Sequence, residues 1–233
     1  MSAAGLFVNA MSWVTIIWSM NAAACLTMGA MQLMVWCRNR NGWANLVFCC
    51  SAVSAAIIAG FELAGMRSES TAQMGLLLRW ANLPFFVLIV SLVWFVRLYL
   101  GAGRLWLAWT ICSLRGLVLA LNFLFTPNFN YREITKVDHL HWWGGETVSV
   151  PAGVANPWVV IGQLSLLLTV IFCLDAAICV WRRGDKRRAV VVGGSAVVFI
   201  SLTVTQTVLL VWGFIRLPFM HSLAYLGIIV AMA

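Results

Sequence analysis

Seven long apolar blocks, separated by short polar segments, constrain the fold of this chain more than any other feature. A helix needs about 20 apolar residues to cross the hydrocarbon core of a bilayer. Of the 233 residues, 63% are hydrophobic and 9% are charged, a balance far from that of soluble domains. The blocks cover approximately residues 13–37, 43–65, 76–100, 105–125, 157–181, 189–213 and 219–233. Backbone groups in lipid must pair within their own segment, so each block is predicted to be a helix. We therefore expect an all-α membrane protein, a single bundle of seven transmembrane helices surrounded by bilayer lipid.

The basic residues in the gaps predict the orientation of this bundle. Nine lie in or close to one set of alternate gaps and five in or close to the other. The larger set is Arg38, Arg40, Arg97, Arg104, Arg182, Arg183, Lys186, Arg187 and Arg188; the smaller is Arg67, Arg79, Arg132, Lys136 and Arg216. The positive-inside rule places the larger set in the cytoplasm, with the N-terminus outside and the C-terminus inside. The net charge of +8 is thus explained by topology, and no nucleic-acid partner is expected.

The last block is shorter than the others. Residues 219–233 would extend only about 22 Å as a helix, less than a full crossing. The helix is therefore expected to continue beyond residue 233 into a cytoplasmic output domain.

The segment from Thr126 to Asn156 is the longest gap and is predicted to lie outside. Gly144 and Gly145 precede an alternating run from Glu146 to Val150, which predicts a small strand or hairpin between the fourth and fifth helices. A connector of this length is a candidate sensor loop. Its candidate residues are Glu133, Gly144, Gly145 and Glu146. A lid that only seals the bundle is an equal alternative.

Ionisable residues inside spans are costly in lipid, so each is a functional hypothesis. Arg115 lies in the middle of the fourth block and Asp175 in the fifth, and we expect these two to pair. Glu62 near the end of the second block is expected to meet Arg79 in the third. These pairs either belong to a signalling or ligand network or lock the helices together.

A polar seam is predicted in the outer half of the bundle. Its members are Asn82, Gln163, Ser165, Thr203, Thr205, Gln206 and Thr207. Such side chains either hold helices together or line an outward-facing pocket for an unknown small ligand. Asn82 and Pro84 also predict a kink in the third helix.

The sequence identifies no cofactor and no active site. His139 and His141 form a weak candidate pair for a metal, but they lack a third placed ligand. Retinal would need a Lys within a span, and both Lys residues lie in gaps. Haem between two helices would need a His deep in each. No catalytic motif is present, so enzyme activity, if any, would belong to a longer protein.

Eight short stretches, spread over most of the chain, form a recognisable set. They are Phe95-Val-Arg-Leu-Tyr-Leu-Gly-Ala-Gly-Arg104, Leu121-Asn-Phe123, Asn128-Phe-Asn-Tyr-Arg-Glu-Ile-Thr135, Gly144-Gly-Glu-Thr-Val-Ser-Val150, Asn156-Pro-Trp158, Gly162-Gln-Leu-Ser165, Trp181-Arg-Arg-Gly-Asp185 and Gly193-Gly-Ser195. As a set they resemble the N-terminal seven-transmembrane sensor region of bacterial membrane-bound sensor histidine kinases.

This resemblance implies a sensing and signal-transmitting domain of a two-component system in the bacterial cytoplasmic (inner) membrane. It implies a homodimer or partner membrane subunits, and an extracytoplasmic or intramembrane stimulus. The phosphoacceptor His and the ATP-binding motifs are absent from this chain, so no kinase residue carries over. Two other functions remain open. One is a structural or accessory subunit that packs against helices, lipids or pigments; the other is a small-molecule transporter, which would predict inverted repeats.

Overall fold

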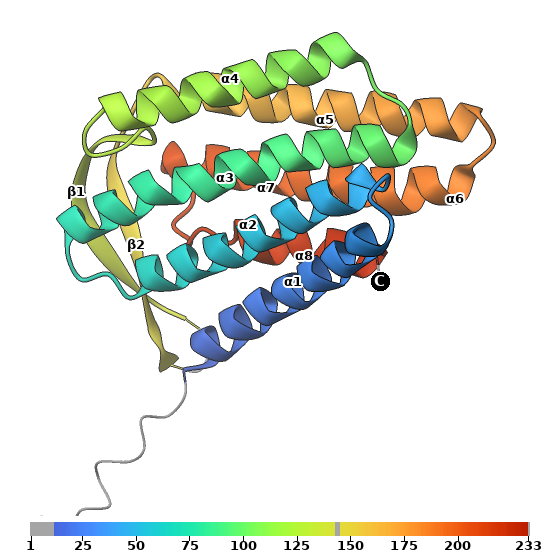
Figure 1. Cartoon of the computed structure of the whole chain (residues 1–233). Helices are drawn as coiled ribbons and strands as arrows, with labels where there is room; N and C mark the ends of the chain where they lie inside the picture. Colours follow the sequence, from blue (N-terminus) through green and yellow to red (C-terminus); the bar gives the residue numbers. More distant parts are fainter. Residues whose placement is uncertain (1–11, 143–144, 233) are drawn as a thin grey trace, which may run out of the picture.

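The computed structural model describes residues 12–142 and 145–232 (Figure 1). This part of the chain is mostly helical, and six of its helical segments are long and apolar enough to cross a membrane. They are α1 (Trp13–Arg38), α2 (Trp43–Met66), α3 (Thr71–Leu100), α4 (Leu105–Leu124), α5 (Val159–Arg182) and the continuous segment Lys186–Val211. The chain is therefore a multi-pass membrane protein.

The sixth long segment is not a uniform α-helix. It consists of α6 (Lys186–Arg188), a π-helical turn (Ala189–Gly194) and α7 (Ser195–Val211). A Cβ atom added at Gly193 would lie 2.6 Å from the Cβ of Ala177 in α5. Glycine thus lets the π-helical turn approach α5 more closely than any larger residue would.

The last apolar block forms α8 (His221–Met232), which has 12 residues and is shorter than the six long segments. It packs against α1, α2 and α7, behind α1 and α2 in the view of Figure 1. Within the described residues the fold thus comprises six long apolar segments and one short apolar helix. The continuation expected after residue 233 lies outside the described residues.

Two strands connect α4 to α5. β1 (Tyr131–His141) and β2 (Thr147–Ala155) form an antiparallel two-stranded sheet with Tyr131 opposite Ala155 and His141 opposite Thr147. The sheet crosses one end of the bundle, where β1 contacts α3 and β2 contacts α2 (Figure 1). We call this the hairpin end. β2 extends beyond the run from Glu146 to Val150 that alternation predicted, and Gly144 lies outside the described residues.

The opposite end, which we call the basic end, holds the turns α1–α2, α3–α4 and α5–α6. Local sequence explains these boundaries. Gly101 adopts φ 58° at the end of α3, a conformation that glycine tolerates best. Asp185 caps α6 by accepting a hydrogen bond from the Arg188 amide. At the hairpin end, the hydroxyl of Ser70 caps α3 by accepting one from the Gln73 amide.

Most of the side chains buried inside the bundle are apolar, and many apolar side chains also lie on its outer surface. In α3, Leu88, Ile89 and Leu92 are fully buried, and this helix contacts α2, α4 and α5. α3 continues through Pro84 to Leu100, although a kink is predicted there. On α5, the exposed apolar residues include Leu164, Leu167, Ile171, Leu174 and Ile178. An apolar stripe on the outside of a helix fits contact with lipid rather than water.

Candidate functional site

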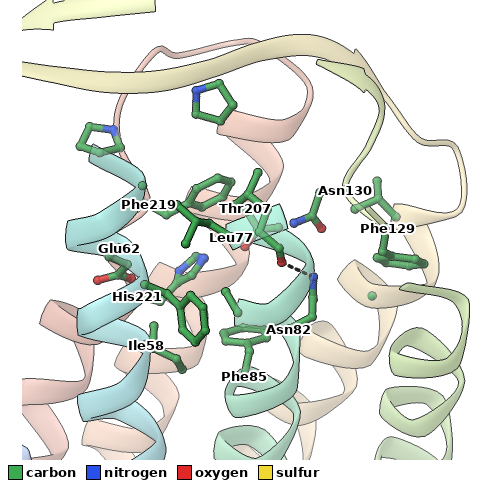
Figure 2. Close-up of a pocket in the computed structure, with 18 of the residues that line it drawn as sticks. Ile58, Glu62, Leu77, Asn82, Phe85, Phe129, Asn130, Thr207, Phe219 and His221 are labelled. Carbon is green, nitrogen blue, oxygen red and sulfur yellow. Dashed lines mark hydrogen bonds between the residues drawn. The ribbon is translucent and has the colours of Figure 1, made fainter. Parts of the chain in front are cut away.

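A cavity of about 100 Å³ lies at the hairpin end of the bundle (Figure 2). Side chains from α2, α3, α4, α5, α7 and α8 form its walls, together with Phe129, Asn130 and part of β2. Most of the lining is apolar and includes Ile58, Leu77, Phe85 and Phe219. The cavity lies beside the start of the short helix α8, whose first residue, His221, is part of the lining.

Six polar side chains from the helices also line this cavity. They are Glu62 of α2, Asn82 of α3, Arg115 of α4, Gln163 of α5, Thr207 of α7 and His221 of α8. The structure thus brings together five residues from two predicted groups, the ionisable residues within spans and the polar seam. Of the six, only His221 was not a candidate. The burial of His221 depends on where α8 packs, which the sequence does not show.

Glu62 joins three helices on one side of the cavity. Its carboxylate accepts hydrogen bonds from Trp18 Nε1 at 2.9 Å, from the Ser222 amide at 3.1 Å and from the Ser222 hydroxyl. The predicted pair with Arg79 is therefore wrong. Arg79 donates to the Phe123 carbonyl at 2.5 Å. The rotation of α2 about its own axis directs Glu62 toward α1 and α8. The order of the helices along the chain does not determine this rotation.

Arg115 is buried in the cavity wall with 4% of its surface exposed. Its Nη2 donates to the Gly162 carbonyl at 3.3 Å, and its guanidinium lies 5.1 Å from the ring centre of Phe85. The predicted pair with Asp175 is also wrong. Asp175 lies near the basic end, where its Oδ1 is 3.6 Å from Arg104 Nε. The two residues occupy different levels of the bundle, and Asp175 does not line the cavity at the hairpin end.

Four buried polar atoms on the cavity-lining residues have no hydrogen-bond partner. They are Arg115 Nε, Gln163 Nε2, Thr207 Oγ1 and His221 Nδ1, and they come from four different helices. Gln163 is otherwise bonded, because its Oε1 accepts from Trp212 Nε1 at 3.3 Å. Buried polar groups are normally paired, so this concentration of unpaired atoms marks the cavity as a candidate binding site.

The remaining members of the predicted seam do not line the cavity. Ser165 and Thr203 each donate to a carbonyl of their own helix, Gly162 O at 2.8 Å and Phe199 O at 2.9 Å. Gln206 donates to the Pro218 carbonyl at 3.1 Å and so holds the connector that precedes α8. The seam therefore separates into cavity residues and residues that satisfy the backbone.

Asn122 is a structural residue that the sequence did not single out. Its Oδ1 accepts from Asn82 Nδ2 at 3.0 Å and from the Phe129 amide at 3.1 Å. Its Nδ2 donates to the Arg79 carbonyl at 2.8 Å. Asn122 of α4 thus connects this helix to α3 and to Phe129, in the segment that leads into β1. An Asn near the end of an apolar block was the signal that the sequence offered.

The predicted sensor-loop residues have separate positions. The Glu146 carboxylate accepts from the Trp13 amide at 2.5 Å and from the Ser12 hydroxyl, which ties the sheet to the start of α1. The Ser12 hydroxyl is the largest cause of a lowered pKa for Glu146. Glu133 is exposed on β1 opposite Val154, and Gly145 is exposed with φ 79°.

The two candidate metal ligands are in β1. His139 Nδ1 lies 3.2 Å from the Ser149 hydroxyl across the sheet, and His141 is exposed. Among the residues that the structure describes, no group of three or more His, Cys, Asp or Glu side chains is placed to hold a metal ion.

Comparisons of this chain with protein families, with curated proteins and with solved structures find no match.

Proposed function

We propose that this chain is the sensing and signal-transmitting membrane domain of a bacterial histidine kinase. In this proposal it lies in the cytoplasmic membrane with seven spans, the N-terminus outside and the hairpin end facing outward. The observation that carries the proposal is the direct connection between the cavity and α8. His221 lines the cavity, and the next residue, Ser222, is bonded to Glu62 through both its amide and its hydroxyl.

A sensor needs an element whose position depends on ligand contacts that differ between two states. α8 is suited to this role because few polar contacts hold it. Besides the bonds to Glu62, the Tyr225 hydroxyl lies 2.6 Å from the Ser51 hydroxyl of α2. An occupant that displaces His221 or Phe219 would strain these bonds and move α8 against α2. The direction of α8, from the cavity toward the basic end, would carry that movement to the cytoplasmic side.

The coding sequence that follows Ala233 provides the first test. We expect it to encode a dimerisation helix with a phosphoacceptor His and then ATP-binding motifs. A stop codon shortly after Ala233 would overturn the kinase proposal and favour an accessory membrane subunit.

The second test measures the output of the full-length protein in vesicles as autophosphorylation. Ser222→Ala removes one bond to Glu62 and should shift the basal phosphorylation level at least threefold. Ser54→Ala is the matched control, because Ser54 is also a buried serine but lies in α2 and does not line the cavity. Equal phosphorylation in the wild type and both variants, at equal amounts of inserted protein, would show that the Glu62 bonds do not transmit a signal.

A further inference from the structure

The cavity has one buried cation, Arg115, that forms no ion pair with any carboxylate of the described residues. Among the described residues, no Asp or Glu oxygen lies within the 4.0 Å that defines an ion pair with Arg115. Glu62 also lines the cavity, but its carboxylate is bonded to Trp18 and Ser222 and makes no ion pair with Arg115. A buried charge without a partner is costly. The site is therefore electrostatically suited to an anion.

The unpaired atoms around the cavity require a ligand that accepts hydrogen bonds. The Arg115 Nε–H and the Gln163 amide nitrogen can only donate. The Thr207 hydroxyl can donate, and His221 Nδ1 donates in one of its two neutral tautomers. None of these four atoms has a partner within the described structure. A carboxylate has about four acceptor sites on two oxygens, so one such group could pair with several of these donors.

The side chains in the cavity wall determine the size and polarity of the uncharged part of the ligand. The rings of Phe85 and Phe219 and the side chain of Leu77 surround the space in Figure 2. The cavity volume is about 100 Å³, which is of the same order as engineered apolar cavities that take up benzene. The space thus suits a single ring or a short alkyl chain, with its charged group directed at Arg115.

From this combination we infer that the cavity binds a small monocarboxylate, a ring-sized or short-chain apolar molecule whose carboxylate pairs with Arg115. This inference names the ligand class of the sensor and rests on the proposed function for its signalling role, while the binding itself can be measured separately. The apolar part of the ligand contacts the cavity wall, and the ion pair with Arg115 favours a negatively charged ligand over a neutral one.

The test uses benzoate as the probe and the protein reconstituted in nanodiscs of neutral phosphatidylcholine. Saturable binding is measured by fluorine NMR with 4-fluorobenzoate and by displacement with unlabelled benzoate. Benzamide has nearly the same shape but no charge, and should bind at least tenfold more weakly. Absence of saturable benzoate binding to the folded protein, with water as the only occupant, would overturn the inference. Equal binding of benzamide, or preferred binding of a neutral benzoquinone, would overturn the assignment of a carboxylate.

Two variants locate the binding site. Arg115→Gln should weaken benzoate binding at least tenfold and leave benzamide binding nearly unchanged. Because Arg115 is buried, its substitution could prevent folding, and a second variant therefore tests the site independently. Thr207→Val keeps the shape of the side chain and should weaken binding about threefold, since it removes one donor. Thr203→Val is the matched control, because Thr203 lies one turn away in α7 and bonds to its own helix.

The results separate the two proposals. Unchanged benzoate affinity in both Arg115→Gln and Thr207→Val would place the ligand elsewhere and overturn this inference. Benzoate binding that depends on Arg115, in a full-length protein whose phosphorylation does not respond to benzoate, would support the site and count against the sensor function.

Discussion

The indole nitrogen of Trp18 in α1 donates a hydrogen bond to the carboxylate of Glu62 in α2, at 2.9 Å, inside the helix bundle. Both residues are buried, with 3% and 8% of their surfaces exposed. The same carboxylate binds Ser222 of α8. The first two helices and the last helix are thus connected through one side chain, next to the cavity.

Glu62→Gln should destabilise the protein by about 1.5–3 kcal/mol. The amide replaces an acceptor with a donor, which then faces the donors of Trp18 and Ser222, and hydrogen bonds to charged groups have about this value. Trp18→Phe should lower the free energy of unfolding by less, about 0.6 kcal/mol, as is typical of polar contacts between membrane helices. Unfolding in detergent micelles measures both. Glu69→Gln, at an exposed position, is the control, and an equal effect of Glu62→Gln and Glu69→Gln would contradict this account.

Gly193→Ala should destabilise the bundle, because the new methyl group would lie 2.6 Å from the Cβ of Ala177 and force α5 away from the π-helical turn. Overpacking of this kind costs about 1–3 kcal/mol. Gly194→Ala is a control in the same turn, where an added Cβ meets nothing within 4 Å. It should change the free energy of unfolding by less than about 1 kcal/mol, in the stabilising direction. Similar unfolding curves for the two variants would disprove the close contact.

The sheet should be held less firmly in acid. Hydrogen bonding from Lys136, with the nearby charge of Arg216, holds the pKa of Asp138 below its ordinary value of 3.8, and the Ser12 hydroxyl lowers the pKa of Glu146 below 4.5. Groups with a lowered pKa in the folded state stabilise it above their ordinary pKa, and this stabilisation disappears as the pH falls through the lowered value. Between about pH 5 and pH 3, amide exchange in β1 and β2 should therefore accelerate beyond its intrinsic pH dependence.

Glu146→Gln is the control for this prediction. Its sheet should already exchange faster at neutral pH and respond less to acid, because one of the two titrating contacts is missing. Exchange in the sheet that follows only the intrinsic pH dependence in the wild type would show that these carboxylates do not hold it in place.

Asp175→Asn should have little effect on stability, although Asp175 lies within a span. Its partner Arg104 is 3.6 Å away, and the two side chains are 34% and 66% exposed. Exposed ion pairs contribute at most about 1 kcal/mol. Arg104→Gln should give the same small change in unfolding. A loss of several kcal/mol in either variant would mean that the pair is buried by a partner molecule.

Length and hydropathy predicted where the helices lie. α1 begins at Trp13, α2 at Trp43 and α4 at Leu105, as the apolar blocks indicated, because lipid requires an apolar and internally hydrogen-bonded segment of a certain length. Glycine and alternation indicated a strand after Gly145. Arg115 and Glu62 were identified for the same reason, since a charged residue inside an apolar block is conspicuous whatever the fold.

The tertiary structure alone decided which residues Glu62 and Arg115 contact. A helix that is apolar on all sides carries no periodic signal to show how it is rotated about its axis. Chain order therefore suggested Arg79 for Glu62 and Asp175 for Arg115, and both pairs were wrong. The rotation of α2 directs Glu62 to Trp18 and Ser222, and the convergence of four helices leaves Arg115, Gln163, Thr207 and His221 around one cavity. The sequence thus determined that this chain crosses a membrane and where its charges lie along the helices, whereas the packing of helices against one another determined which charges meet.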